Sequence, residues 1–240
     1  MLHAIEDRVK YRLVKKIADG GMGSVYKAIQ DGANGFQKIV GIKTLLPELS
    51  DNQRYVDMFI QEAKLVANLV HENIVQIYQL GQMQEGYYFA MEYVHGLSLH
   101  EFNHFHHNVI KERIPSELAV FIASRIARGL AYAHSRSDSV GRPLNIVHRD
   151  VCPNNIMITT EGLPKLTDFG IALISAGMIE SRQGLVGKLT YMSPEQAQRQ
   201  KVDFRADIFS LGAVLFEMLS NQRIRVSDDR AKAQEQAEQG

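Results

Sequence analysis

The sequence is poor in cysteine, in net charge and in long apolar runs, and each shortage excludes a class of protein. A single cysteine, Cys152, allows no disulfide within the chain, which excludes a disulfide scaffold. Lysine plus arginine number 27, as do aspartate plus glutamate, so no overall field predicts binding to nucleic acid or an anionic membrane. The longest apolar stretch, residues 208–219, is interrupted by polar residues and is too short to span about 30 Å of hydrocarbon. The first residues lack the apolar region of a signal peptide. We therefore expect a soluble, cytoplasmic protein without a membrane segment.

The chain divides into a β-rich first part and a mainly helical second part. Its 240 residues suit one large domain or two small ones, at about 150 residues per domain. Alternation and turn residues predict strands at residues 11–18, 24–29, 36–45, 74–80 and 87–94. Helical spacing predicts helices from residue 56 to 69, from 115 to 134 and from 206 to 220, and short strands flank a loop within 147–158. The tail, residues 228–240, has almost no apolar face, so we expect it to lie at the surface.

Four short motifs follow one another along the chain, and the first is a glycine cluster between two strands. Residues 18–25 contain Gly20, Gly21 and Gly23, which allow backbone amides to approach phosphate oxygens closely. A plain tight hairpin explains the cluster equally well. A dinucleotide-binding fingerprint is disfavoured, because it needs a helix after the glycines.

The other three motifs bring a lysine, acidic side chains and an asparagine. Lys43 lies on a strand, and Glu62 on the following helix is placed to form an ion pair with it. A loop from His148 to Asn155 contains Asp150, and Asp168 precedes Phe169 and Gly170. Carboxylate and amide oxygens suit Mg²⁺ with bound phosphate. The four motifs in this order predict a phosphate-handling site.

With these motifs, the chain resembles the eukaryotic-like protein kinases, specifically their bacterial Ser/Thr branch. The matching motifs are Gly20-Gly21-Met22-Gly23-Ser24-Val25, Gly41-Ile42-Lys43, His71-Glu72-Asn73, Met91-Glu92-Tyr93-Val94, His148-Arg149-Asp150, Asp168-Phe169-Gly170, Tyr191-Met192-Ser193-Pro194-Glu195 and Asp207-Ile208-Phe209-Ser210. The resemblance implies an α+β, bilobal protein-kinase fold over residues 1–240, with a small β-rich N-lobe (1–94) containing one main helix and a larger helical C-lobe (95–240).

The resemblance also implies the roles of the site residues. Asp150 is expected to accept the substrate proton, Asn155 and Asp168 to hold Mg²⁺, and Lys43, paired with Glu62, to contact the ATP phosphates. The other positions implied for ATP binding are Ile17, Ala18, Gly20, Gly21, Gly23, Val25, Gly41, Met91, Glu92, Val94 and Ser98. Asp207 is expected to anchor the catalytic loop, and Phe169 to stack with His148. The implied partners are ATP and protein substrates, with self-association for autophosphorylation at Ser181.

The sequence departs from the family pattern at three places. Ala18 replaces the first glycine of the nucleotide loop, where we expect a minor effect. Cys152 stands where Ser/Thr kinases carry a lysine, and Lys188 stands where they carry a threonine, so we hypothesise that Lys188 supplies the missing charge. The late helices and the arginine that pairs with Glu195 are missing, so the chain is either a fragment of a longer protein or a kinase with a shortened C-lobe.

Other interpretations remain open. A pseudokinase scaffold would bind nucleotide or partners without transferring phosphate. A small-molecule kinase is disfavoured by the docking sequence Ser193-Pro194-Glu195, and a tyrosine kinase by the catalytic-loop sequence. Four histidines between residues 100 and 107 suggest a metal site or, more simply, a solvated face. Cys152 suggests a redox switch or, more simply, inert packing.

Overall fold

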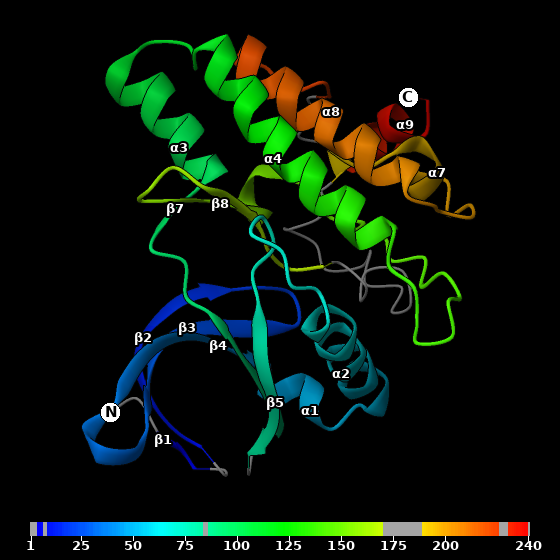
Figure 1. Cartoon of the computed structure of the whole chain (residues 1–240). Helices are drawn as coiled ribbons and strands as arrows, with labels where there is room; N and C mark the ends of the chain where they lie inside the picture. Colours follow the sequence, from blue (N-terminus) through cyan, green and yellow to red (C-terminus); the bar gives the residue numbers. More distant parts are fainter. Residues whose placement is uncertain (1–3, 7–8, 84–85, 170–188, 226–229, 240) are drawn as a thin grey trace. The chain divides into compact units, whose positions relative to one another are not determined.

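The computed structural model describes residues 4–6, 9–83, 86–169, 189–225 and 230–239, and it divides into two compact units (Figure 1). The small unit contains the described residues up to Val70 and those of Val75–Val94. The large unit contains His71–Ile74 and the described residues from His95 onward.

The small unit is built on one six-stranded antiparallel sheet with the order β1-β2-β3-β4-β6-β5. Its strands are β1 (Ala4–Glu6), β2 (Lys10–Asp19), β3 (Gly23–Asp31), β4 (Gln37–Leu45), β5 (Ile77–Met83) and β6 (Gly86–Glu92). A 3-10 turn, η1 (Ala33–Gly35), joins β3 to β4. The register of β3 with β4 is continuous from Gly23 opposite Leu45 to Asp31 opposite Gln37. This unbroken pairing gives the side chains of β4 fixed positions on the two faces of the sheet.

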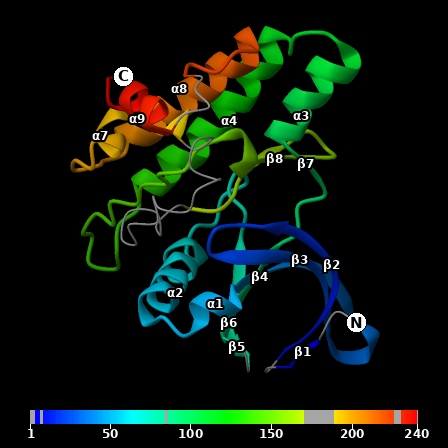
Figure 2. The ribbon, with the colours of Figure 1, turned by 180° about the vertical axis from the view of Figure 1, so that it is seen from behind.

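The small unit also contains two helices between β4 and β5, α1 (Pro47–Ser50) and α2 (Gln53–Ala67) (Figure 2). The side chain of Asn52 caps α2 by accepting a hydrogen bond from the Arg54 amide at 3.1 Å. Phe59 of α2 packs against Phe89 of β6, with ring centroids 5.0 Å apart. The apolar stripe of α2 therefore packs against the sheet, as its helical spacing predicts.

The large unit is mainly helical and contains a small three-stranded sheet. Its elements are β7 (Gly96–Ser98), α3 (Leu99–Phe105), the π-helical turn η2 (His106–Ile110), α4 (Ser116–His134), η3 (Pro153–Asn155), β8 (Ile156–Thr159), β9 (Pro164–Leu166), α7 (Pro194–Ala197), α8 (Arg205–Ser220) and α9 (Arg230–Gln239). Helices α4 and α8 lie side by side, as Figures 1 and 2 both show. Buried residues of α4 such as Ile122, Ile126 and Leu130 form one core with Val214 and Met218 of α8. The predicted α+β architecture, with a β-rich part before a helical part, is confirmed.

Three expectations about secondary structure are wrong, each because tertiary contacts override the local pattern. Strand β5 begins at Ile77 rather than at Ile74, since Ile74 forms a parallel bridge with Leu166 of the large unit's own sheet. Val147 lies outside any strand, because the next two amides donate to the side chain of Asp207.

The third wrong expectation concerns the tail. Its helix α9 is not merely a surface segment, since Ala237 is completely buried in a cluster with Leu189 and Ala197. Small alanine side chains give a helix a packing face that a hydrophobicity pattern hardly reveals. Among the described residues, no helix has both the length and the apolar character needed to cross a membrane.

Candidate active site

The glycine cluster of the small unit forms the turn between β2 and β3. The Gly20 amide donates to the Gly23 carbonyl at 2.8 Å, which closes the turn. A Cβ at Gly21 would meet no atom within 4 Å, whereas a Cβ at Gly23 would lie 2.4 Å from the Thr44 carbonyl oxygen. Gly23 is therefore required for the close approach of β3 to β4. Gly21 is the position at which the turn is open.

The residues predicted to contact the adenine lie on β2, β3, β4 and β6, except for Val94, which follows β6. Ile17 is exposed on β2, and Gly41 of β4 lies opposite Met91 of β6. A Cβ at Gly41 would approach the Met91 side chain to 3.1 Å, so Met91 packs closely against the backbone of this buried glycine. The Glu92 amide donates to the Gln76 carbonyl at 2.8 Å and is thus engaged within the small unit. A nucleotide base would have to use other backbone atoms of residues 92–94.

Lys43 and Glu62 form a buried ion pair in the small unit. Lys43 Nζ lies 2.9 Å from Glu62 Oε1, and the two side chains are 12% and 6% exposed. The ammonium also lies 5.4 Å from the centroid of the Phe89 ring. Burial makes this pair sensitive to the loss of either partner, because the remaining charge would be stranded away from water. The lysine is therefore held in one place before any ligand arrives.

In the large unit, Asp207 fixes the backbone of residues 148–155, the loop predicted to be catalytic and called the catalytic loop here. Its two carboxylate oxygens accept hydrogen bonds from the amides of His148, at 2.8 Å, and Arg149, at 2.7 Å. His134 Nε2 lies 2.8 Å from the same carboxylate. Asp207 is completely buried, so each of these charge-assisted bonds forms away from competing water. Arg149 adopts a left-handed backbone with φ of 69°, a conformation that this anchoring supports.

Asp150 and Asn155 face each other across the catalytic loop. Asn155 Nδ2 donates to the Asp150 carbonyl at 2.9 Å and to Asp150 Oδ2 at 3.0 Å. The Asp150 amide donates to His148 Nδ1 at 3.2 Å. The carboxylate is thus oriented from two directions, by the amide of Asn155 and through its own backbone. Because the nitrogen of the Asn155 amide is turned to Asp150, the amide oxygen is the atom left to act as a metal ligand.

Asp168 lies next to this loop through the backbone. The amide of Thr167 donates to the Asn155 carbonyl at 2.9 Å, which ties the segment before Asp168 to the catalytic loop. Asp168 itself has φ of 55°, a left-handed conformation that is uncommon for aspartate. Phe169 is buried and packs on His148, with ring centroids 4.5 Å apart. Burial lowers the pKa of His148, so the ring is neutral.

The donor set of Asn155 and Asp168 fits a magnesium ion. One amide oxygen and one carboxylate are hard oxygen ligands, and Mg²⁺ characteristically takes few protein ligands and completes its shell with waters and phosphate oxygens. Among the described residues, no group of three His, Cys, Asp or Glu side chains is placed to hold a metal.

The residues after the gap in the described chain, 189–193, form a segment that we call the docking stretch. Tyr191 donates its hydroxyl to the Glu217 carboxylate, and Ser210 Oγ donates to the Tyr191 carbonyl at 2.7 Å. Burial raises the pKa of Tyr191, which keeps the hydroxyl protonated. Ser193 is the N-cap of α7, and Gln196 Nε2 donates to the Arg149 carbonyl at 2.9 Å. The docking stretch and the catalytic loop are thus connected through α7.

Several predicted site residues lie elsewhere or have other partners. Ser98, predicted near the ribose, caps α3 by accepting from the Glu101 amide at 3.1 Å, while its hydroxyl donates to Glu101 Oε2 at 2.8 Å. Cys152 is buried among the apolar side chains of the large-unit core. Lys188 and Ser181 lie outside the described residues.

Sequence reasoning missed two residues of this region. His134 contacts Asp207 from the last turn of α4, and Arg225 contacts the docking stretch from the segment after α8. Neither belongs to one of the recognised motifs, so no local signal marks them. The buried carboxylate of Asp207 and the buried backbone of the docking stretch create the need for these partners.

Comparison with known proteins places these features in a family. The family model described as the protein kinase domain matches residues 11–240. A tyrosine-protein kinase, MasK of Myxococcus xanthus, is 43% identical over 216 residues, which cover 89% of this chain and 33% of that protein. The serine/threonine-protein kinase PrkC of Bacillus subtilis is 36% identical over 214 residues, which cover 89% of this chain and 31% of that protein.

A solved structure gives the same result for the fold. The crystal structure of a mutant of the Mycobacterium tuberculosis PknI kinase domain matches with a TM-score of 0.67 and 25% identity. The match covers 90% of this chain and 76% of that one. The chain spans about a third of the length of the two curated relatives named above.

Proposed function

Because the chain belongs to the protein kinase domain family, we propose that it is an active kinase that transfers the γ-phosphoryl group of ATP to protein hydroxyls in the presence of Mg²⁺. The observation that carries this proposal is the pair of hydrogen bonds from Asn155 Nδ2 to Asp150. They orient the carboxylate and leave the amide oxygen of Asn155 for a metal. A scaffold that only bound nucleotide would have no use for an oriented carboxylate.

In the proposed reaction, the hydroxyl oxygen of the substrate forms a bond to the γ-phosphorus, and the bond from that phosphorus to the β,γ-bridging oxygen breaks. ADP leaves, and the hydroxyl proton passes to the carboxylate of Asp150. Lys43, held by Glu62, binds phosphate oxygens of ATP. Asn155 and Asp168 would hold Mg²⁺, which supplies charge neutralisation on the phosphates when it is bound. The protein contributes mainly positioning and electrostatics.

We propose serine and threonine as the acceptors. The catalytic-loop sequence and the proline of Ser193-Pro194-Glu195 favour this specificity. The relatives point in two directions, since PrkC is named a serine/threonine kinase and MasK a tyrosine kinase. Acid hydrolysis of the labelled product followed by phosphoamino-acid separation distinguishes the two.

We further propose that the chain self-associates for autophosphorylation at Ser181, and that Arg149 receives the phosphate. Arg149 Nε is buried and has no hydrogen-bond partner among the described residues, which leaves a donor for an anion. Replacing Ser181 by alanine should remove the principal phosphopeptide and lower activity. Phosphopeptide mapping that found only Ser175 or Thr190 occupied would contradict this site.

Lys188 is proposed to supply the charge that Cys152 cannot. The proposal rests on the sequence, in which one lysine is missing at position 152 and one is gained at position 188. Lys188→Thr should lower kcat by ~30-fold or more, and adding Cys152→Lys should restore much of the loss. Wild-type kcat in Lys188→Thr, or no rescue by the second substitution, would dismiss the compensation.

The proposed function is tested by incubating the purified chain with γ-labelled ATP and Mg²⁺, with and without a basic protein substrate. We expect label on serine or threonine of the substrate and none when Asp168→Asn replaces the wild type. Mg²⁺-independent ATP binding without transfer would instead favour the pseudokinase scaffold.

A further inference from the structure

Arg225 is a buried arginine in the segment that follows α8. It is 8% exposed, whereas its neighbours in the sequence, Arg223 and Ile224, are exposed. Arginine is almost never fully buried unless it is paired. Burial lowers the pKa of Arg225, the direction that indicates a desolvated guanidinium, yet arginine remains charged in proteins.

Only one of the three nitrogen atoms of the guanidinium, Nη1, forms hydrogen bonds to the described residues. Its Nη1 donates to the Met192 carbonyl at 2.6 Å and to the Leu189 carbonyl at 3.2 Å. The group also lies over the Phe209 ring of α8, with Cζ 5.1 Å from the ring centroid. Both carbonyls belong to the docking stretch, and they flank Thr190 and Tyr191. One side chain thus fixes the two ends of a four-residue stretch of backbone.

The other side of the guanidinium is unsatisfied within the part of the chain that the structure describes. There, Nε and Nη2 are buried without a hydrogen-bond partner, and none of the ion pairs includes Arg225. A buried charge without a counterion destabilises a folded protein, and an apolar side chain of similar volume would commonly be more stable. An arginine that breaks this rule points to a role other than stability.

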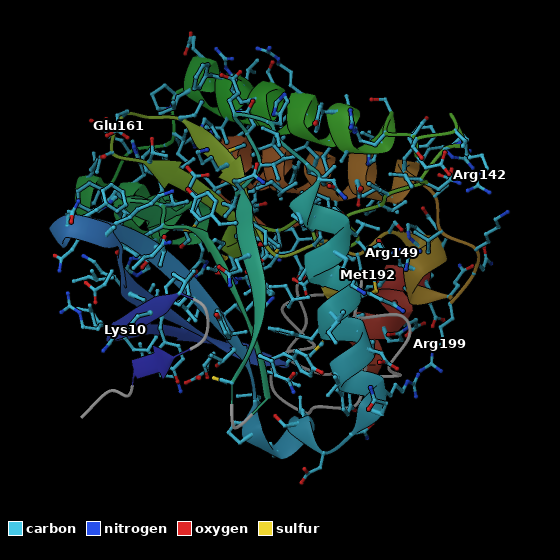
Figure 3. The ribbon with its side chains drawn as sticks, turned by 60° about the horizontal axis from the view of Figure 1, so that its bottom comes forward. Lys10, Arg142, Arg149, Glu161, Met192 and Arg199 are labelled. Atoms are coloured by element: carbon cyan, nitrogen blue, oxygen red, sulfur yellow. The ribbon has the colours of Figure 1, made fainter. Side chains whose placement is uncertain are left out.

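The contacts of the docking stretch indicate what Arg225 does. Ser210 and Glu217 of α8 hold Tyr191, and Arg225 holds the residues on both sides of it. Met192 is followed directly by Ser193, the cap of α7, and α7 reaches the Arg149 carbonyl through Gln196. Figure 3 labels Met192 and Arg149, the two ends of this connection. The backbone that Arg225 fixes is therefore joined to the catalytic loop.

We infer that Arg225 is a positioning residue for the protein substrate, which shapes the docking stretch through the carbonyls of Leu189 and Met192. The inference rests on the proposed kinase function and deepens it, because it assigns a residue to the recognition of the protein substrate rather than of ATP. The inference separates substrate docking from the stability of the fold. Removing the guanidinium should weaken substrate docking while the free energy of unfolding stays the same or rises.

The test compares three variants of the full chain. Arg225→Met removes the charge and keeps most of the volume, and Arg225→Lys keeps a charge that can still donate to the carbonyls. Arg223→Met is the matched control, since it removes the same charge from an exposed position in the same segment. The measurements are KM for myelin basic protein, KM for ATP, the melting temperature, and hydrogen exchange of the amides in residues 189–193.

For Arg225→Met we expect KM for myelin basic protein to rise about tenfold, while KM for ATP changes less than about twofold. Its melting temperature should equal or exceed that of the wild type, and amides of the docking stretch should exchange faster. Arg225→Lys should recover most of the substrate affinity, and Arg223→Met should match the wild type in every measurement.

Three results would overturn the inference. The first is an unchanged KM for myelin basic protein in Arg225→Met, and the second is unchanged exchange in residues 189–193. The third is a fall of the melting temperature by more than about 5 °C, which would make Arg225 an ordinary structural residue. A wild type that transfers nothing would refute the proposed function, and the exchange experiment would then decide on its own whether Arg225 holds the docking stretch.

Discussion

The two units hold their functional side chains in different ways. In the small unit, Lys43 sits in a strand whose partners are paired residue by residue, and its ammonium is fixed by one buried carboxylate. In the large unit, the catalytic loop is positioned by side chains that bond to backbone, chiefly Asp207 and Asn155. The first arrangement depends on regular structure, and the second on individual buried polar groups. We therefore expect that replacing polar side chains of the small unit, other than Lys43 and Glu62, has little effect. In the large unit, replacing any one of the anchoring side chains should disturb the catalytic loop.

The largest effect is expected at the oriented carboxylate of the large unit. Asp150→Asn should lower kcat by about 10³-fold or more, because the variant loses the group that we propose accepts the proton and orients the hydroxyl. ATP affinity should change little. Steady-state kinetics with calorimetric ATP binding measures both. A matching loss of ATP affinity would mean that Asp150 supports the fold of the loop rather than the reaction.

The ion pair of the small unit gives the next largest effect. Lys43→Met strands the buried carboxylate of Glu62, so we expect a loss of about 3–5 kcal/mol in the free energy of unfolding, together with loss of transfer. The double variant Lys43→Met/Glu62→Met should recover most of the stability and none of the activity. Denaturant titration and transfer assays test this. Equal stability of the single and double variants would show that the pair is not coupled.

Two glycines of the turn between β2 and β3 test how closely the regular structure of the small unit is packed. Gly23→Ala would place a Cβ against the Thr44 backbone, so it should cost about 1–3 kcal/mol. Gly21→Ala is the matched control, and since its Cβ would meet open space we expect a change within about 0.5 kcal/mol. Urea midpoints provide the measurement. Equal midpoints for the two variants would contradict the close approach of β3 to β4.

The smallest effect is a difference in acid sensitivity between the units. Burial lowers the pKa of His148 and of His71, both in the large unit, so below about pH 6.5 the unfolded chain binds protons that the folded unit does not. Stability of the large unit should therefore fall between pH 7 and pH 5, by about 2–4 °C in melting temperature.

In the small unit, the acidic groups with shifted pKa are Asp19, which is exposed, and Asp31, which is half-buried. The pKa of Asp19 is lowered by Lys16 and Ser24, and that of Asp31 chiefly by Arg12, so they lose their contribution only as pH falls toward the carboxylate range. Hydrogen exchange at pH 7 and pH 5 assigns the change to a unit. Loosening of the small unit before the large one would reverse this order.

The contrast between the units also explains what the sequence can predict. Strand β4 and helix α2 follow from the spacing of apolar residues, because regular structure repeats its environment along the chain. The start of β5 does not, since Ile74 pairs with Leu166 far along the chain. Motifs identify Lys43, Asp150 and Asp168, whereas His134 and Arg225 act through partners distant in sequence and leave no local pattern.

The roles assigned to the individual site residues, the lobe boundary at residue 94 and the cytoplasmic location stay predictions. For Ser98 the structure adds a competing explanation, because its hydroxyl is used to cap α3. For Lys188 and Ser181 it adds nothing, since both lie outside the described residues. Sequence motifs thus give no indication of which side-chain atoms are already engaged within the fold.

The proposed kinase reaction, which assigns a role to both Lys43 and Asp168, is tested most directly by transfer rates of Lys43→Met, Asp168→Asn and the double variant, relative to the wild type. When two residues act together in one reaction, the rate losses of their single variants do not multiply in the double variant. The account predicts that the wild type transfers phosphate and that each single variant lowers the transfer rate by about 10³-fold or more. The double variant should be no slower than the slower of the two single variants. Losses that multiply, or a wild type that transfers nothing, would contradict it.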